Sequence, residues 1–122
     1  MTSGFFFDSY AVVELIQASP NYELYKEEPV TITQFNLAEI YWFALLRLDA
    51  KTASTIFDRF RPCVVDVDDA TLKEAIQFRK THKKRDLSYA DCIGYIYAKR
   101  HGLRFLTGDK EFEDLPNVEF VK

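Results

Sequence analysis

The chain has 122 residues, of which 48% are apolar and 16% are aromatic. This length and composition exclude an intrinsically disordered chain and predict one folded domain over residues 1–122. The net charge of −3 argues against a protein that coats nucleic acid through its overall charge. It is compatible with an enzyme whose acidic residues gather in one site.

No sequence signal for a membrane or for export is present. The longest unbroken apolar run covers residues 40–46, which is far fewer than a membrane-spanning helix needs. The apolar run near the N-terminus has no basic region before it and is interrupted by Asp8. We therefore expect a cytoplasmic protein that does not associate with a membrane.

Short apolar runs alternate with helical patterns in the first half of the chain. From the N-terminus we expect a strand at residues 5–7, a helix capped by Ser9, a short helix at 20–28, a strand at 29–32, a helix capped by Thr33 at 34–48, and a helix at 50–60. The helix at 34–48 is strongly apolar, which predicts that it packs against the core.

The alternation continues in the second half. There we expect a strand at 63–67, a helix at 69–85, a helix capped by Ser88 at 89–101, a strand at 103–107, a helical turn at 109–115 and a strand at 118–121. Strands that alternate with helices are typical of a parallel sheet covered by helices. The sequence therefore predicts an α/β fold with three α/β/α layers and a mainly parallel central sheet.

Acidic residues follow several of the expected strands. Asp8 ends the first strand, Asp109 follows "RFLTG", and Asp66 and Asp68 lie at the end of "CVV". In open parallel sheets the functional crevice lies at the carboxyl ends of the strands. We therefore expect some of these carboxylates to meet at one edge of the sheet.

Two further acids, Glu39 and Asp91, lie on expected helices without a basic residue three or four positions away. A carboxylate on an apolar helix is costly unless something pairs with it. Taken singly, an Asp at a strand end is better explained as a loop or cap residue than as a ligand, and Glu39 is equally well explained as the partner of a distant arginine. Taken together, Asp8, Glu39, Asp91 and Asp109 indicate a site for Mg²⁺ or Mn²⁺, ions that activate water for attack on a phosphodiester.

Three local motifs resemble those of the PIN-domain ribonucleases, in particular the small VapC-like toxins of toxin–antitoxin pairs. "FFFDSYAVVEL" resembles the opening strand with its Asp and hydroxyl residue, and "TQFNLAEIYWFAL" resembles the helix that carries the Glu. "SYADCIGYIYAKRHGLRFLTGDKEF" resembles the Ser-x-x-Asp helix followed by a strand and Thr-x-Asp-x-x-Phe. The resemblance spans nearly the whole chain and implies hydrolysis of single-stranded RNA segments, an antitoxin partner and a homodimer.

The resemblance also implies roles for individual residues. Asp8, Asp91 and Asp109 would bind the metal ion directly, and Glu39 would bind through water or orient the attacking water. Ser9 and Thr107 would hold the carboxylates by hydrogen bonds. The chain departs from the family at Tyr10, where an Asn is frequent two residues after the first Asp.

Two surfaces are candidates for binding partners. The basic run "RKTHKKR" could hold the RNA backbone near the crevice, or it could be only the solvated end of a helix. Its cationic residues are Arg79, Lys80, Lys83, Lys84 and Arg85. The aromatic helices around Trp42 and Phe57 are mostly expected in the core, with part of their surface open to an antitoxin peptide or a second subunit.

Three alternatives remain open at the level of sequence. "VVDVDDAT" imitates the Asp-x-Asp motif of haloacid-dehalogenase-like phosphatases, but the position two after the second Asp is Ala70 rather than Thr or Val. A receiver domain would need adjacent acids after its first strand and a lysine after its last, where Lys122 is a poor candidate. A degenerate PIN domain that only binds is disfavoured because all four acids are present.

Overall fold

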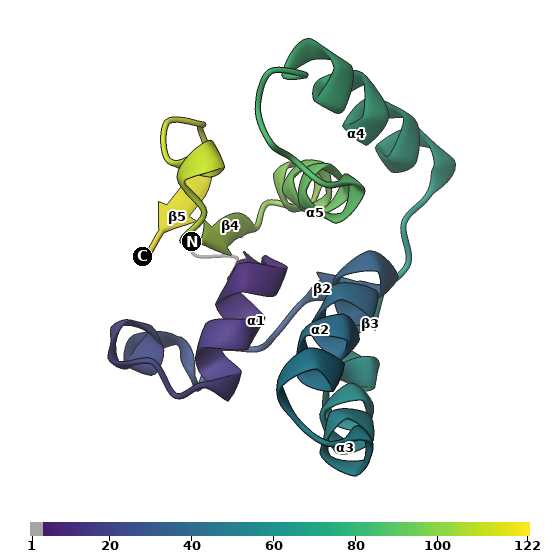
Figure 1. The fold of residues 1–122 in the computed structure, drawn as a ribbon. Helices are drawn as coiled ribbons and strands as arrows, with labels where there is room; N and C mark the ends of the chain where they lie inside the picture. The colour runs from purple at the N-terminus through teal and green to yellow at the C-terminus, as the bar shows by residue number, and fades with distance from the viewer. Residues whose placement is uncertain (1–3) are drawn as a thin grey trace.

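The computed structural model describes residues 4–122 (Figure 1). In chain order its elements are β1 (Phe5–Phe7), α1 (Ser9–Ile16), the 3₁₀ helix η1 (Pro20–Tyr25), β2 (Ile32–Thr33), α2 (Gln34–Arg47), α3 (Ala50–Phe60), η2 (Arg61–Cys63), β3 (Val64–Val65), α4 (Asp69–Thr81), α5 (Tyr89–Arg100), β4 (Arg104–Thr107), η3 (Lys110–Phe112) and β5 (Val118–Phe120). Strands and helices follow one another as the sequence predicts. Five elements are clearly shorter than expected: the helix at 20–28 is a six-residue 3₁₀ helix, β2 and β3 have two residues each, α4 ends at Thr81, and the turn at 109–115 is the three-residue η3.

All strand pairs within the described residues are parallel. The main sheet has the order β1-β4-β5, with Phe7 opposite Leu106 and Thr107 opposite Phe120. The strands β2 and β3 form a separate parallel pair. The Phe7 N–H donates to the Thr31 carbonyl at 2.9 Å, which joins this pair to the main sheet.

Alternation along β1 and β4 sends side chains into two cores. Phe6 and Phe105 pack with α5 on one face, whereas Phe7 and Leu106 pack with α1, α2 and α3 on the other. In Figure 1 α5 and α1 accordingly lie on opposite sides of β4. Gly94 lets α5 approach closely, because an added Cβ there would lie 2.5 Å from the Phe6 ring. This arrangement confirms the predicted three-layer α/β fold.

Short polar side chains begin the helices. Thr33 and Ser88 each form a capping box with the residue three positions later, and Asp49 and Asp68 each accept a hydrogen bond from the third residue after them. The caps at Thr33 and Ser88 are those that the sequence predicts, and Asp68 caps α4. The cap predicted at Ser9 is wrong, because Asp8 accepts from the Ser9 N–H and Ser9 is the first residue of α1. No helix within residues 4–122 is long and apolar enough to cross a membrane.

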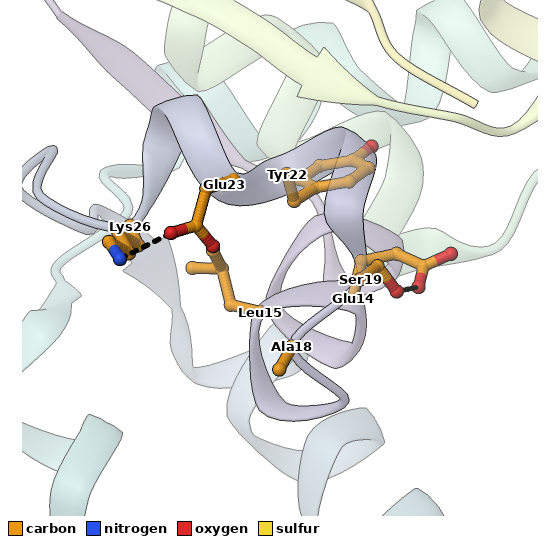
Figure 2. Close-up of a pocket in the computed structure, with 7 residues that line it drawn as sticks. All are labelled: Glu14, Leu15, Ala18, Ser19, Tyr22, Glu23 and Lys26. Carbon is orange, nitrogen blue, oxygen red and sulfur yellow. Dashed lines mark hydrogen bonds and ion pairs between the residues drawn. The ribbon is translucent and has the colours of Figure 1, made fainter.

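The segment after α1 returns to the C-terminal strand. Tyr22 of η1 is buried, and its hydroxyl donates to the Val121 carbonyl at 2.5 Å. A hollow of about 210 Å³ remains between α1 and η1, closed at its rim by a hydrogen bond from Ser19 to Glu14 (Figure 2). The bond from Tyr22 to Val121 therefore holds the segment that follows α1 against the C-terminal end of the chain.

Candidate active site

Four acidic side chains from four elements lie close enough for their charges to act on one another near the carboxyl edge of the main sheet. Asp8 follows β1 and Asp109 follows β4, which pair directly in the sheet. Glu39 lies on α2 and Asp91 on α5. The charges of Asp91 and Glu39 both act on Asp8, and those of Glu39 and Asp109 both act on Asp91. The structure therefore brings together the four acids that the sequence singles out, whereas Asp66 is an exposed residue after β3.

Asp8 is 2% exposed and each of its oxygens accepts a hydrogen bond. Oδ1 accepts from the Ser9 N–H at 2.8 Å, and Oδ2 accepts from the Thr107 hydroxyl at 2.6 Å. The Thr107 oxygen in turn accepts from the Asp109 N–H at 3.1 Å. Thr107 thus joins the carboxylate that ends β1 to the loop that follows β4.

The other two aspartates are held by backbone N–H groups at helix starts. Asp91 accepts from the Ser88 N–H at 2.8 Å through Oδ2, as the third residue of α5. Asp109 caps η3 by accepting from the Glu111 N–H at 3.0 Å through Oδ1. Both carboxylates are therefore fixed in direction by local sequence.

Glu39 is held by Ser9, and Ser9 is held by Asn36, a residue that the sequence analysis did not identify. Its Oε1 accepts a hydrogen bond from the Ser9 hydroxyl at 2.6 Å, and the Asn36 amide donates to the same Ser9 oxygen at 3.0 Å. Asn36 is completely buried. The available signal was the spacing Thr33-x-x-Asn36, which repeats that of Ser88-x-x-Asp91.

The carboxylates lie in an environment that disfavours their charge. Burial raises the pKa of Asp8 well above its usual value, the Asp91 carboxylate raises it further, and the bonds from Thr107 and Ser9 lower it. Burial likewise raises the pKa of Asp91 to about 6. The hydrogen bond from the Ser88 N–H lowers this pKa, whereas the charges of Glu39 and Asp109 raise it. The site has more negative charge than its hydrogen bonds offset.

A hard divalent cation fits this donor set. All four side chains offer oxygen, and their accumulated negative charge is what such an ion neutralises. Within residues 4–122 no three His, Cys, Asp or Glu side chains already stand as ligands of a single ion. The hydrogen bonds described above hold the carboxylates, and their like charges keep them apart. The carboxylates would therefore have to move closer together when a cation binds.

A scan against protein-family models matches the PIN domain over residues 5–118. The chain belongs to the PIN domain family. Solved structures with this fold include VapC20 of Mycobacterium tuberculosis, described as a sarcin-ricin loop cleaving toxin (TM-score 0.79, 18% identity, 97% of this chain and 99% of that one). A toxin–antitoxin complex from Klebsiella pneumoniae (0.71, 18%, 94% and 95%) and VapBC2 of Rickettsia felis bound to a promoter DNA fragment (0.69, 17%, 98% and 99%) are also similar. A search of curated proteins found no match.

Membership of the PIN family confirms the resemblance drawn from the three motifs and replaces the phosphatase and receiver alternatives. Two further contacts near the carboxylates involve Tyr10 and Asn36. Tyr10, where an Asn is frequent, packs against the loop after β4, since an added Cβ at Gly108 would lie 2.4 Å from its ring. An amide contacts Ser9 from α2, where the Asn36 Nδ2 group donates to the Ser9 hydroxyl oxygen.

A pocket of about 380 Å³ adjoins the carboxylates of this PIN domain. It is lined by Tyr10, Asp86, Gly108, Asp109, Lys110, Glu111 and Lys122. The two lysines provide positive charge next to an otherwise acidic site.

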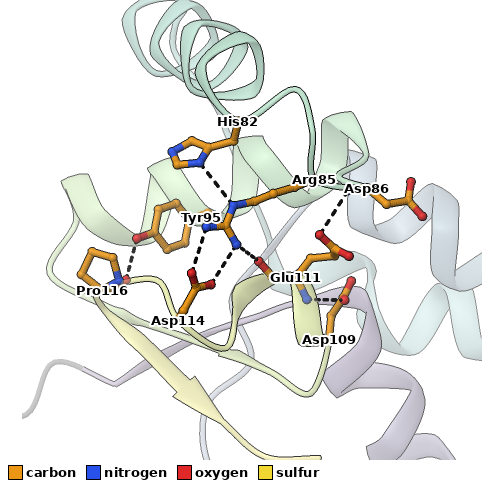
Figure 3. Close-up of polar contacts among 8 residues, drawn as sticks. All are labelled: His82, Arg85, Asp86, Tyr95, Asp109, Glu111, Asp114 and Pro116. Carbon is orange, nitrogen blue, oxygen red and sulfur yellow. Dashed lines mark hydrogen bonds and ion pairs between the residues drawn. The ribbon is translucent and has the colours of Figure 1, made fainter.

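The basic run divides into two kinds of residue. Arg85 donates to both Asp114 oxygens, at 2.8 and 3.1 Å, and to the Glu111 carbonyl at 2.7 Å (Figure 3). It therefore anchors η3, the element that Asp109 caps. The other four cations, Arg79, Lys80, Lys83 and Lys84, are exposed.

The aromatic helices also divide between core and surface. Phe60 is buried and Phe57 packs edge-on against Tyr41 at 5.4 Å, but Trp42 is 62% exposed. Large apolar side chains are exposed along one helix and the turn after it, namely Phe35, Trp42, Leu45, Leu46 and Leu48. We call these five residues the α2 apolar surface.

Proposed function

We propose that this PIN domain is a divalent-metal-dependent endoribonuclease that cleaves single-stranded RNA segments. The observation that carries the proposal is the convergence of Asp8, Glu39, Asp91 and Asp109 at the carboxyl edge of the sheet, where burial and mutual repulsion raise the pKa of Asp8 and of Asp91. A site that only bound a partner would have no need of four poorly compensated acids. The retention of all four therefore speaks against a degenerate, purely binding PIN domain.

The residues of the chain divide the work between them. Asp8, Asp91 and Asp109 would hold Mg²⁺ or Mn²⁺ directly, and Glu39 would hold it through water and orient the attacking water. When bound, such an ion acts as a Lewis acid and lowers the pKa of water. Ser9 and Thr107 are the hydrogen-bond donors that fix Glu39 and Asp8 in direction.

Substrate and partner follow from the surfaces around the site. The exposed cations Arg79, Lys80, Lys83 and Lys84 would contact the RNA backbone.

The α2 apolar surface groups five exposed apolar side chains, whereas single exposed apolar side chains are normal on a monomer. This surface would be covered by an antitoxin segment or by a second copy of the chain. Structures of toxin–antitoxin complexes with the same fold support the proposal that this chain is the toxin of such a pair. Light scattering of the pure protein and co-purification from its host test this, and a monomer without a partner in both would contradict it.

The decisive experiment is RNA cleavage with a matched pair of variants. Labelled RNAs are incubated with the protein in Mn²⁺, in Mg²⁺ and in EDTA, and the products are separated on gels. Cleavage in either metal, none in EDTA, and a loss of orders of magnitude in Asp91→Asn are expected. Asp66→Asn is the control, because it removes an exposed aspartate outside the site and should cleave normally. Unchanged cleavage by folded Asp91→Asn would falsify the site, and a requirement for Asp66 in hydrolysis of phosphate monoesters would favour the phosphatase mechanism.

A further inference from the structure

The side-chain amide of Asn36 has only one possible orientation. Its Oδ1 accepts from the Thr33 N–H at 2.9 Å and from the Thr33 hydroxyl at 2.8 Å. A backbone N–H cannot accept a hydrogen bond, so the oxygen of the amide has to face Thr33. The Nδ2 group therefore faces Ser9, where it lies 3.0 Å from the hydroxyl oxygen.

This orientation determines where the Ser9 proton points. The Asn36 Nδ2 group has protons and no lone pair, so Ser9 Oγ accepts from it and cannot donate back. The single hydroxyl proton of Ser9 is then directed to Glu39 Oε1 at 2.6 Å. Glu39 Oε1 is thus held as an acceptor by a chain of bonds that begins at the backbone of Thr33.

We propose that Asn36 is a positioning residue for the reaction, acting on Glu39 through Ser9. With Oε1 committed to Ser9, rotation of the Glu39 carboxylate is restricted, and its second oxygen would be left to orient the attacking water. Asn36 touches neither ion nor substrate in this scheme. The inference rests on the proposed nuclease function, and it assigns to α2 an orienting amide that supports its own glutamate three residues later.

Asn36→Asp tests the direction of the bonds with little change of shape. Aspartate can keep both acceptor bonds from Thr33, and Asp91 shows that an aspartate accepts from the capping N–H in the equivalent box of α5, but it cannot donate to Ser9. The Ser9 proton then has two carboxylates to choose between. We expect kcat for RNA cleavage to fall by about tenfold or more with KM within about twofold, because substrate contacts are unchanged.

A double-mutant cycle with Ser9→Ala separates this mechanism from the added charge. In the Ser9→Ala background the chain of bonds is already broken, so Asn36→Asp should cost less than about threefold further. A through-space effect of the new charge would instead cost the same in both backgrounds and would overturn the proposal. Asn36→Ser, which is uncharged and too short to span both partners, should behave as Asn36→Asp does and serves if the aspartate variant does not fold.

Two further measurements keep structural and functional causes apart. Asp49→Ala removes the cap of α3, which takes no part in the chain of bonds to Glu39, so it should lower the melting temperature and leave kcat within about twofold. In ¹⁵N-labelled metal-free protein, the Asn36 side-chain amide protons should be protected from exchange and lose protection in Ser9→Ala. Independent costs of the two substitutions in an active enzyme, or an unprotected amide, refute the role of Asn36 while the nuclease stands. A wild-type protein that cleaves no RNA in Mn²⁺ refutes both.

Discussion

Neutralising Asp91 should stabilise the metal-free protein. Asp91→Asn keeps the shape of the side chain, and the new amide oxygen can accept from the Ser88 N–H as the carboxylate does at 2.8 Å. The chain contains its own precedent, because Asn36 occupies the same position in the capping box of α2 and accepts from Thr33 at 2.9 Å. The substitution therefore removes a charge with little loss of the helix start.

The size of the effect follows from the raised pKa. A rise from 3.8 to about 6 means that the folded protein binds a proton between these pH values that the unfolded chain has lost. Stability therefore falls as pH rises through this window and stays low above it. At about 1.4 kcal/mol for each tenfold change in acidity, the upper limit is about 3 kcal/mol. Partial exposure of Asp91 reduces this, and we expect a gain of about 1–2 kcal/mol, or about 4–8 °C in Tm.

Melting curves of both proteins in EDTA, at pH 4 and pH 7, provide the assay. Asp91→Asn should melt higher than wild type at pH 7, and the difference should be much smaller at pH 4, where the folded wild-type carboxyl is protonated and the unfolded one, with a pKa of 3.8, is partly protonated. Adding Mn²⁺ at 100 times its dissociation constant should stabilise wild type by about 2.7 kcal/mol and the variant by less. Asp66→Asn, at an exposed position, should match wild type throughout. A lower Tm for Asp91→Asn in EDTA at pH 7, with the full Mn²⁺ gain retained, would refute the reasoning.

Three further substitutions test the surroundings of the site. Asp8→Asn should also lose Mn²⁺ stabilisation, but it should gain less in EDTA than Asp91→Asn, because the Thr107 hydroxyl loses its acceptor; parallel melts that show an equal or larger gain would contradict this. Gly108→Ala should cost about 1–3 kcal/mol and most of the cleavage activity, since its Cβ would lie 2.3 Å from the Val121 carbonyl and displace the loop; denaturant unfolding that matches wild type would show that this contact is not limiting. Arg85→Ala should lower Tm and cleavage without weakening RNA binding in EDTA; filter binding that falls as it does for the exposed lysines would return Arg85 to the RNA surface.

The fold could be predicted because its elements have strong local signals. Phe5–Phe7 is followed at once by a capped helix, and the helix of residues 89–100 is bounded by Ser88 and Gly102. The lengths of β2 and β3 could not be predicted, since only two residues of each find a partner and pairing is decided by tertiary packing. The 3₁₀ form of η1 likewise depends on a distant contact, the bond from Tyr22 to Val121.

The site shows the same division between local and distant information. The four acids could be identified because each lacks a local partner, at a strand end or on an apolar helix face. Asn36 could not be identified in this way, because its role depends on the hydrogen bond to Ser9. Ser9 lies 27 residues away and comes within reach only when α1 and α2 pack together. Arg85 reads as one more cation in a basic run, and only its contact with Asp114, 29 residues on, shows that it anchors η3.

The hydrogen bonds that hold the aspartates also explain how the protein tolerates them without an ion. Asp8 caps α1, Asp91 is the third residue of α5, and Asp109 caps η3, so the N-termini of three helices are directed at one cluster of carboxylates. Helix N-termini favour negative charge, but the pKa of Asp8 and of Asp91 still lies above the usual range. The helix starts therefore fix the directions of the carboxylates without neutralising them. With a pKa of about 6, Asp91 relieves part of the repulsion by taking up a proton in mildly acidic solution. At neutral pH, where that proton is largely lost, a divalent cation would relieve the repulsion instead. Affinity for the ion should consequently weaken as pH falls through 6, even though the metal-free fold becomes more stable.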